Sequence, residues 1–383
     1  MQSTLPARGG AVLLAALAAL MAGCATTPMP VATNYFYVGG KYTGTGAQRK
    51  LSGHMYVQSF EPAQKKHPWP VVLVHGNSQS GNNFIGTIDG RPGWAQDFAA
   101  RGYTVYVVDQ VGRGRSGTFP SLYGAYGEPS ITLVELLARA PDTTFPTAKL
   151  NTQWPDKGVA GEPYFDQFLA QQMPSVRDVV KIEELNLAGH LALLEKIGPA
   201  ILVEHSQAGV FGWKVADTRP DLVKALIAIE PNGPPFYNLA LPYQNSAPPP
   251  GGPWYRYTND LIRPWGLTRL PLTYSPPLET PPASVLQAKS EGPDLAPCYL
   301  QASPVHTLPQ LAKVTIGLFT AEASFRTASD HCNALFLRQA GVKVDHVKLA
   351  DKGVHGNGHM MMLEKNSSAV AGVLMDWLEG KGL

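Results

Sequence analysis

Several short runs in the chain are continuously apolar and rich in β-branched residues, and they constrain the fold more than any other feature. They cover residues 70–74, 104–108, 201–203, 225–229 and 314–319, with a weaker run at 346–349. Such runs are typical of strands that are covered on both faces of a parallel sheet. Stretches of helical character separate them, at residues 93–101, 182–196, 210–218, 331–340 and 368–378. The alternation predicts a mostly parallel, doubly wound α/β sheet with helices on both faces, opened by antiparallel strands at 35–40 and 53–58.

Two long stretches interrupt this alternation, residues 118–175 and 231–290. The first contains one predicted helix, at 131–140, and the second is rich in Pro and aromatic residues. Loops of this length in a compact domain are usually functional lids or linkers, and aromatic residues argue against disorder. We predict that 231–290 forms a cap over the site. Its aromatic residues either wall a substrate pocket or pack the cap onto the sheet: Trp254, Tyr255, Tyr257, Trp265 and Tyr274.

The N-terminus predicts export. Arg8 precedes an apolar run at 11–21 that is too short to span a bilayer, as in a signal peptide. The run ends in Met-Ala-Gly-Cys24, which resembles the lipobox of bacterial lipoproteins. We therefore predict a signal peptide at 1–23, a tether at 24–34 and a folded domain at 35–383. Lipid on Cys24 would anchor the protein to the membrane in the periplasm or at the outer membrane, whereas an ordinary signal peptide would give a secreted protein.

Cys298 and Cys332 remain once Cys24 is set aside. An even pair in an oxidising compartment indicates a disulfide, and two free buried thiols are the alternative. The formal net charge of the 383-residue chain is +2, and Lys and Arg do not cluster among aromatic residues. We therefore expect no nucleic-acid partner.

Ser206 stands where the apolar run 201–203 meets the small residues Ala208 and Gly209. A sharp strand–turn–helix of this kind exposes a serine hydroxyl above a parallel sheet, where it can act as a nucleophile. Glu204 departs from the usual pattern, because Gly or Ala normally relieves crowding two residues before such a serine. The sequence predicts Ser206 as the nucleophile, with one unusual neighbour.

A serine nucleophile needs a histidine base, and His359 is the candidate because it lies in a Gly-rich loop just before the last predicted helix. His355, four residues earlier, is the rival. Their spacing resembles a metal-binding pair, but glycines between them preclude a stable helix face and no HExxH pattern follows. We therefore expect no metal at this site.

The acid that orients the base has two candidates, Glu230 and Glu322. Glu230 closes the apolar strand 225–229, where a carboxylate is unfavourable without a role, and Glu322 follows the strand 314–319. We prefer Glu230. For the oxyanion hole we predict the backbone N–H groups of Gln207 and Asn77, which follow the nucleophile and an earlier strand end. The Gly-x-Gly pattern within 109–116 is interpreted as a structural turn.

Together these motifs resemble the α/β-hydrolase superfamily, and within it a group of exported bacterial carboxylesterases. The resemblance rests on the His-Ser206-Gln elbow, the Glu230 position, the Gly-Asn-Gly-His359-Met-Met-Met loop, and residues 89–94 and 109–116. It covers most of 35–378 and is weakest in the two inserts. It implies the α/β-hydrolase fold, a Ser206–His359–Glu230 triad and no cofactor. One known member carries two adjacent cysteines in the oxyanion loop, where this chain has Asn77-Ser78.

The function expected from these residues is hydrolysis of carboxylic esters through an acyl-enzyme on Ser206. The same groups also serve amides, lactones, thioesters and polyesters, which the sequence does not separate. A serine in place of aspartate excludes dehalogenase chemistry. A non-catalytic binding lipoprotein on a hydrolase fold is the alternative from another class, and the complete set of site residues argues against it.

Overall fold

The computed structural model describes residues 31–240 and 254–383. The predicted signal peptide and lipidated Cys24 lie outside the described residues. The predicted tether at 24–34 is wrong at its end, because β1 (Ala32–Thr43) begins within it. Thr33 and Asn34 already pair with Phe60 and Ser59 of β2 (Lys50–Glu61), so these residues belong to the sheet.

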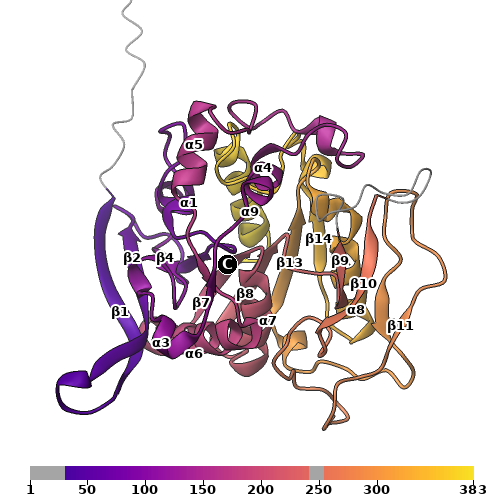
Figure 1. Ribbon diagram of the computed structural model, residues 1–383, viewed down its shortest axis with the longest axis horizontal. Helices are drawn as coiled ribbons and strands as arrows, with labels where there is room; N and C mark the ends of the chain where they lie inside the picture. The colour runs from indigo at the N-terminus through magenta and orange to yellow at the C-terminus, as the bar shows by residue number, and fades with distance from the viewer. Residues whose placement is uncertain (1–30, 241–253) are drawn as a thin grey trace, which may run out of the picture.

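An eight-stranded sheet forms the centre of the molecule, in the order β1-β2-β4-β3-β7-β8-β13-β14 (Figure 1). The first two strands pair antiparallel and β2 also runs antiparallel to β4, whereas the other neighbours pair parallel. This confirms the predicted α/β sheet with an antiparallel opening. The remaining strands are β3 (Val71–Val74), β4 (Val105–Asp109), β7 (Ala200–His205), β8 (Val223–Ile229), β13 (Thr315–Thr320) and β14 (Asp345–Lys348).

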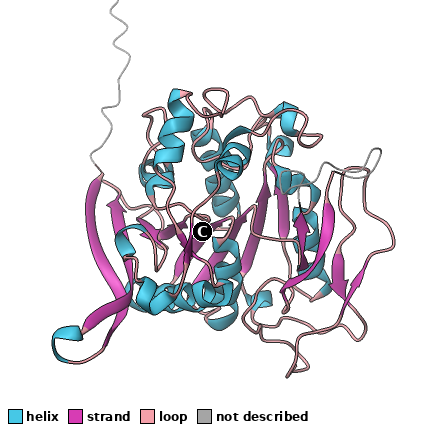
Figure 2. Cartoon of the chain, in the orientation of Figure 1, coloured by secondary structure: helices cyan, strands magenta, loops and turns pink. Residues whose placement is uncertain are grey.

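Helices cover both faces of the sheet (Figure 2). Alternate residues of each strand enter different cores: Leu73 packs in one hydrophobic cluster, and Val72 and Val74 pack in the other. This two-sided burial explains the continuous apolar runs. One face carries α1 (Asn82–Ile85), α2 (Trp94–Arg101) and α9 (Ser367–Gly380), and the other carries α6 (Val179–Ile197), α7 (Ala208–Thr218) and α8 (Asp330–Gln339). None of the helices in the described part of the chain is long and apolar enough to cross a membrane.

The insert at 118–175 contains more regular structure than the sequence predicts. Besides the expected α4 (Ile131–Arg139) it forms α3 (Pro120–Tyr123), α5 (Pro163–Ala170) and the short strands β5 (Tyr126–Gly127) and β6 (Ser175–Val176). Pro at the first position of a helix is compatible with its geometry, which explains the start of α5 at Pro163. In Figure 1, α4 and α5 lie above the central sheet.

The described part of the insert at 231–290 (residues 231–240 and 254–290) contains strands and no helix. β9 (Phe236–Ala240) pairs antiparallel with β10 (Arg256–Arg263), and β11 (Ser284–Leu286) pairs with β12 (Tyr299–Gln301). These ribbons extend the molecule on the side of β14 (Figure 1). Single-turn 3₁₀ helices complete the structure, at Gly46–Gln48, Gly114–Ser116, Ala148–Leu150, Leu311–Lys313, Phe325–Ala328 and Leu349–Lys352.

The sulfur atoms of Cys298 and Cys332 are bonded in a disulfide. Cys298 stands just before β12 and Cys332 lies in α8, so the bond ties the β11–β12 ribbon to a helix that packs on the sheet. Among the described residues, the group of side chains close enough to hold a metal is Cys298, His331 and Cys332. Since the two sulfurs are bonded to each other, this group is a disulfide beside a histidine.

Candidate active site

Ser206 occupies a strained turn between β7 and α7. Its φ is 56°, in the left-handed region that a non-glycine residue rarely adopts. Hydrogen bonds hold the turn, because Ser206 N donates to Ile229 O at 2.9 Å and Asn232 N donates to Ser206 O at 2.8 Å. A Cβ on Gly209 would lie 2.3 Å from the Cβ of Pro231, so this helix start requires glycine. The sequence thus builds a tight elbow at the end of a central strand.

The unusual Glu204 points away from the nucleophile, toward the helices on the other side of β7. Its buried carboxylate lies 3.2 Å from Nε2 of His190 in α6. A Cβ on Gly212 would lie 2.8 Å from Cγ of Glu204, so the glycine in α7 makes room for the longer side chain. Burial raises the pKa of Glu204. Burial alone would lower the pKa of His190, but the adjacent Glu204 carboxylate raises it overall. Gly212 of the facing helix thus provides the space that a small residue at position 204 would otherwise provide.

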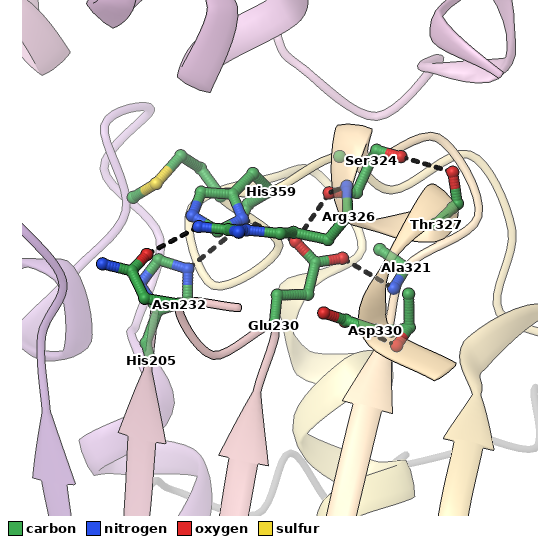
Figure 3. Close-up of polar contacts among 12 residues, drawn as sticks. His205, Glu230, Asn232, Ala321, Ser324, Arg326, Thr327, Asp330 and His359 are labelled. Atoms are coloured by element: carbon green, nitrogen blue, oxygen red, sulfur yellow. Dashed lines mark hydrogen bonds and ion pairs between the residues drawn. The ribbon is translucent and has the colours of Figure 1, made fainter. Parts of the chain in front are cut away.

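His359 and Glu230 form a buried pair. Nδ1 of His359 lies 2.5 Å from Oε2 of Glu230, and the two side chains are 2% and 0% exposed. The Glu230 carboxylate also accepts hydrogen bonds from Ser324 Oγ at 2.7 Å and from Ala321 N at 2.8 Å (Figure 3). Nδ1 of the ring is thereby directed at the carboxylate, and Nε2 is the ring nitrogen that does not contact Glu230.

Burial disfavours the charged forms of both partners. It lowers the pKa of His359 well below its usual range, and the positive charge of Arg326 acts in the same direction. Burial raises the pKa of Glu230, which the hydrogen bonds from Ser324 and Ala321 partly oppose. A histidine that stays neutral is available to accept a proton.

The loop that carries His359 is fixed from two sides. Nε2 of the buried His205 lies 3.0 Å from the backbone oxygen of His359, so the residue before the nucleophile holds the base loop. On the other side, the buried Glu364 carboxylate accepts from Gly358 N at 2.8 Å and from Asn357 Nδ2 at 2.7 Å. The sequence gives no local sign of this contact, because it joins residues 154 positions apart.

The rival residues form a pair of their own. His355 Nδ1 lies 3.2 Å from Glu322 Oε1, and these side chains are 61% and 26% exposed. Glu322 also accepts from Gly356 N at 2.9 Å, so it supports the same loop from outside. The structure therefore brings Glu230 to His359, and it places Glu322 with His355.

A buried arginine connects the two segments that carry the predicted oxyanion donors. Nη1 of Arg113 donates to Gly76 O at 2.8 Å, and Nη2 donates to Asn77 Oδ1 at 3.4 Å and to Gln207 Oε1. The side chain is 0% exposed. Among the described residues, Arg113 forms no ion pair with a carboxylate. Burial lowers the pKa of Arg113 to about 9. A guanidinium this deep normally has a carboxylate partner.

The loop at Asn77-Ser78 is also braced at Ser78, which has a φ of 58°. Ser78 N donates to Ser175 Oγ at 3.1 Å, and Met173 N donates to Ser78 O at 2.8 Å. These contacts and the hydrogen bonds of Arg113 hold the loop in place.

Ser206, His359 and Asn77 line one pocket with a volume of about 190 Å³. Leu133 and Leu137 of α4 form part of its apolar wall, so the insert at 118–175 contributes directly to it. Leu239 and Phe325 complete the apolar part, and the polar part adds Gln79, Asn232, Asn238 and Arg326. Gln207 is not among the residues that line this pocket, and its side-chain oxygen accepts a hydrogen bond from Arg113.

None of the five aromatic residues predicted as pocket walls is among the described residues that line this pocket. Tyr274 and Trp265 are buried together, and Tyr274 Oη donates to Trp265 O at 2.9 Å. Tyr255 and Tyr257 donate to the backbone oxygens of Leu295 and Pro297. Trp265 and Tyr274 belong to the hydrophobic core on one face of the sheet, and Trp254 packs against the core on the other face. Of the two alternatives that the sequence left open, the structure favours packing of the second insert onto the sheet.

Comparison with known proteins supports the fold. Residues 70–268 match the model of a family described as having the α/β hydrolase fold. The chain is 38% identical to the "Probable secreted lipase phiG" of Fungal sp. (strain ATCC 74256) over 351 residues, covering 91% of this chain and 89% of the relative. Among solved structures, a novel bacterial esterase superposes with a TM-score of 0.58 at 20% identity, covering 91% of this chain and 96% of the esterase. The last comparison shows a shared fold.

Proposed function

This chain belongs to the α/β-hydrolase family, and on that premise we propose that it hydrolyses carboxylic esters with Ser206 as nucleophile, His359 as base and Glu230 as the acid that orients the base. The observation that carries the proposal is the buried His359–Glu230 contact of 2.5 Å beside a pocket that His359 shares with Ser206. The strained φ of Ser206 adds support, because such strain concentrates at functional sites.

In the first half of the reaction, Ser206 Oγ attacks the ester carbonyl carbon while His359 Nε2 takes its proton. The carbonyl electrons move onto oxygen, and their return breaks the bond to the alcohol, which leaves with the proton from His359. In the second half, water attacks the acyl-enzyme, again giving its proton to His359. Release of the carboxylic acid restores Ser206. Glu230 stabilises the imidazolium that forms in each half.

The negative charge that develops on the carbonyl oxygen needs donors that are already in place. We assign this role to the backbone N–H groups of Asn77 and Gln207. Arg113 positions both segments through its hydrogen bonds to Gly76, Asn77 and Gln207.

The comparisons favour esters over the other bonds that this chemistry serves, because the 38% identical relative is named a lipase. The same name supports an exported protein. Lipid on Cys24, with the membrane association that it would bring, stays a prediction, and the intact mass of the mature protein tests it.

The test is hydrolysis of p-nitrophenyl esters of acetate, butyrate and octanoate, with the p-nitroanilides of the same acids as a matched series. We expect turnover of at least one ester, weaker or no turnover of the anilides, and a loss of roughly 10³-fold or more in kcat for Ser206→Ala. Activity of Ser206→Ala within about tenfold of the parent would contradict the assignment.

A further inference from the structure

Arg326 is the one permanently charged side chain among the described residues that line the pocket. No Asp or Glu is in that lining, whose other polar groups are a serine, a histidine and four amides. A neutral ester needs no cation beside the nucleophile. The positive charge in the pocket wall therefore suggests a substrate with a negatively charged group.

The guanidinium of Arg326 is held in place by the turn that follows Glu230. Nη2 donates to Asn232 Oδ1 at 2.6 Å and Nη1 donates to Gly233 O at 3.1 Å (Figure 3). Cζ of Arg326 lies 5.2 Å from the centre of the Phe325 ring, and Phe325 also lines the pocket. Because these contacts fix the side chain, it can bind a ligand with little loss of entropy.

Arg326 keeps donors for a ligand. A guanidinium has five N–H groups, and the two hydrogen bonds above use two of them. Nη1 and Nη2 therefore each keep one N–H, whereas Nε is buried without a hydrogen-bond partner. Among the described residues, Arg326 forms no ion pair with a carboxylate. The planar arrangement of such donors suits a carboxylate.

Two buried carboxyl groups lie near Arg326 without lining the pocket. Glu230 is engaged by His359, Ser324 and Ala321. Burial raises the pKa of Asp330 well above its usual range, which favours the neutral acid, and Asp330 accepts a hydrogen bond from Thr320. Neither carboxyl group lines the pocket, so neither occupies the place where an anion would meet Arg326.

The volume of the pocket sets the size of the group that enters it. At about 190 Å³ it is smaller than the roughly 300–1,000 Å³ that drug-sized ligands occupy. A short chain that ends in a polar head fits this space and the mixed wall of leucines and amides.

We propose that Arg326 binds the carboxylate of the substrate, and that the preferred substrates are short esters carrying a negative charge, such as half-esters of dicarboxylic acids or acyl esters of hydroxy acids. This inference rests on the proposed ester hydrolysis at Ser206. A charge-assisted hydrogen bond to such a carboxylate favours the anionic ester by about tenfold to a hundredfold over a neutral one of the same shape.

The experiment compares anionic esters with neutral amides of nearly the same shape. In the acyl arm, monomethyl adipate is paired with methyl 5-carbamoylpentanoate. In the alcohol arm, butyryl glycolate is paired with butyryl glycolamide. The ratio of kcat/KM within each pair reports recognition of the charge, and the arm with the larger ratio shows which part of the ester enters the pocket. We expect a ratio of about ten or more in one arm.

Two variants separate the charge of Arg326 from its support of the turn. Arg326→Gln removes the charge and should bring the ratio to about one. Arg326→Lys keeps the charge but cannot reproduce both hydrogen bonds to Asn232 and Gly233. It should keep a preference for the anion even if kcat falls.

The outcomes distinguish the two proposals. If the parent hydrolyses p-nitrophenyl butyrate but shows a ratio near one in both arms, the anionic substrate class is wrong and ester hydrolysis stands. An unchanged ratio in Arg326→Gln would also overturn the role of Arg326, as would a loss in Arg326→Lys equal to that in Arg326→Gln. If no ester is hydrolysed, both proposals fall.

Discussion

Two histidines of the loop that precedes α9 each pair with a glutamate from elsewhere in the chain, and the two pairs differ in burial and in distance. His359–Glu230 is 2% and 0% exposed at 2.5 Å, whereas His355–Glu322 is 61% and 26% exposed at 3.2 Å. Both glutamates follow neighbouring strands of the sheet, β8 and β13. The inner pair shares a pocket with Ser206 through His359, and the outer pair is absent from that pocket.

The difference shows what turns a common residue pair into a candidate for catalysis. Water screens the outer pair, so its interaction is worth little and either partner can be replaced at small cost. The inner pair is shielded from water and held by Ser324, Ala321 and His205, so its geometry is set before a substrate arrives. The two pairs therefore differ in burial and in the hydrogen bonds that fix them.

The largest expected effect separates the two histidines. His359→Ala should lower kcat by roughly 10³-fold or more, because the serine loses its base, and His355→Ala should stay within about threefold of the parent. Initial rates on p-nitrophenyl butyrate measure both. Equal losses in the two variants would remove the distinction between the pairs.

The next effect separates the two glutamates. Glu230→Gln keeps the shape but removes the charge that holds the ring, so kcat should fall roughly 10²–10⁴-fold. Glu322→Gln should change kcat by about twofold at most, since its partner is exposed. Thermal unfolding of both variants provides the control for folding. A larger loss in Glu322→Gln than in Glu230→Gln would reverse the assignment.

Arg113 sharpens the comparison, because it is as buried as the inner pair but touches no reacting group. Arg113→Met should lower kcat about 10- to 100-fold with little change in KM, since it loosens the predicted oxyanion donors. Arg113→Lys keeps the charge but cannot reach all three oxygens, and its kcat should lie between those of the parent and of Arg113→Met. A loss confined to KM would argue for a role in substrate binding instead.

The smallest expected effect on activity is at the disulfide, which is not among the residues that line the pocket. Replacing both Cys298 and Cys332 by serine should lower the free energy of unfolding by about 3 kcal/mol, because the unfolded chain regains its freedom. The kcat should stay within about twofold. Denaturant unfolding and ester hydrolysis measure the two quantities separately, and a large loss of kcat in a well-folded variant would contradict the account.

Local patterns predicted most of the sheet. Residues 225–229 are all apolar and Glu230 follows them directly. A carboxylate at the end of such a strand is unfavourable without a role, and this favoured Glu230 over Glu322. The same reasoning placed β3, β4 and β13, whose side chains enter both cores. These features depend on neighbours within a few residues, so a single sequence contains them.

Contacts between distant segments were not predicted. The turn at 109–116 was expected from its glycines, but the contact of Arg113 with Gln207 spans 94 residues and leaves no local signal. Arg326 was missed for the same reason, since its partner Asn232 lies 94 residues away. The apolar pocket wall includes Leu133 and Leu137 of the first insert and Leu239 of the second, although the aromatic residues of the second insert gave the more conspicuous pattern.

The central claim is that Ser206 is the nucleophile of this site. Labelling the mature protein with a fluorophosphonate and mapping the adduct by peptide mass spectrometry tests it most directly, because the probe reacts with an activated serine whatever the natural substrate is. We expect one adduct, on Ser206, and strongly reduced labelling in His359→Ala but not in His355→Ala. An adduct on another residue, or equal labelling of Ser206→Ala, would contradict it.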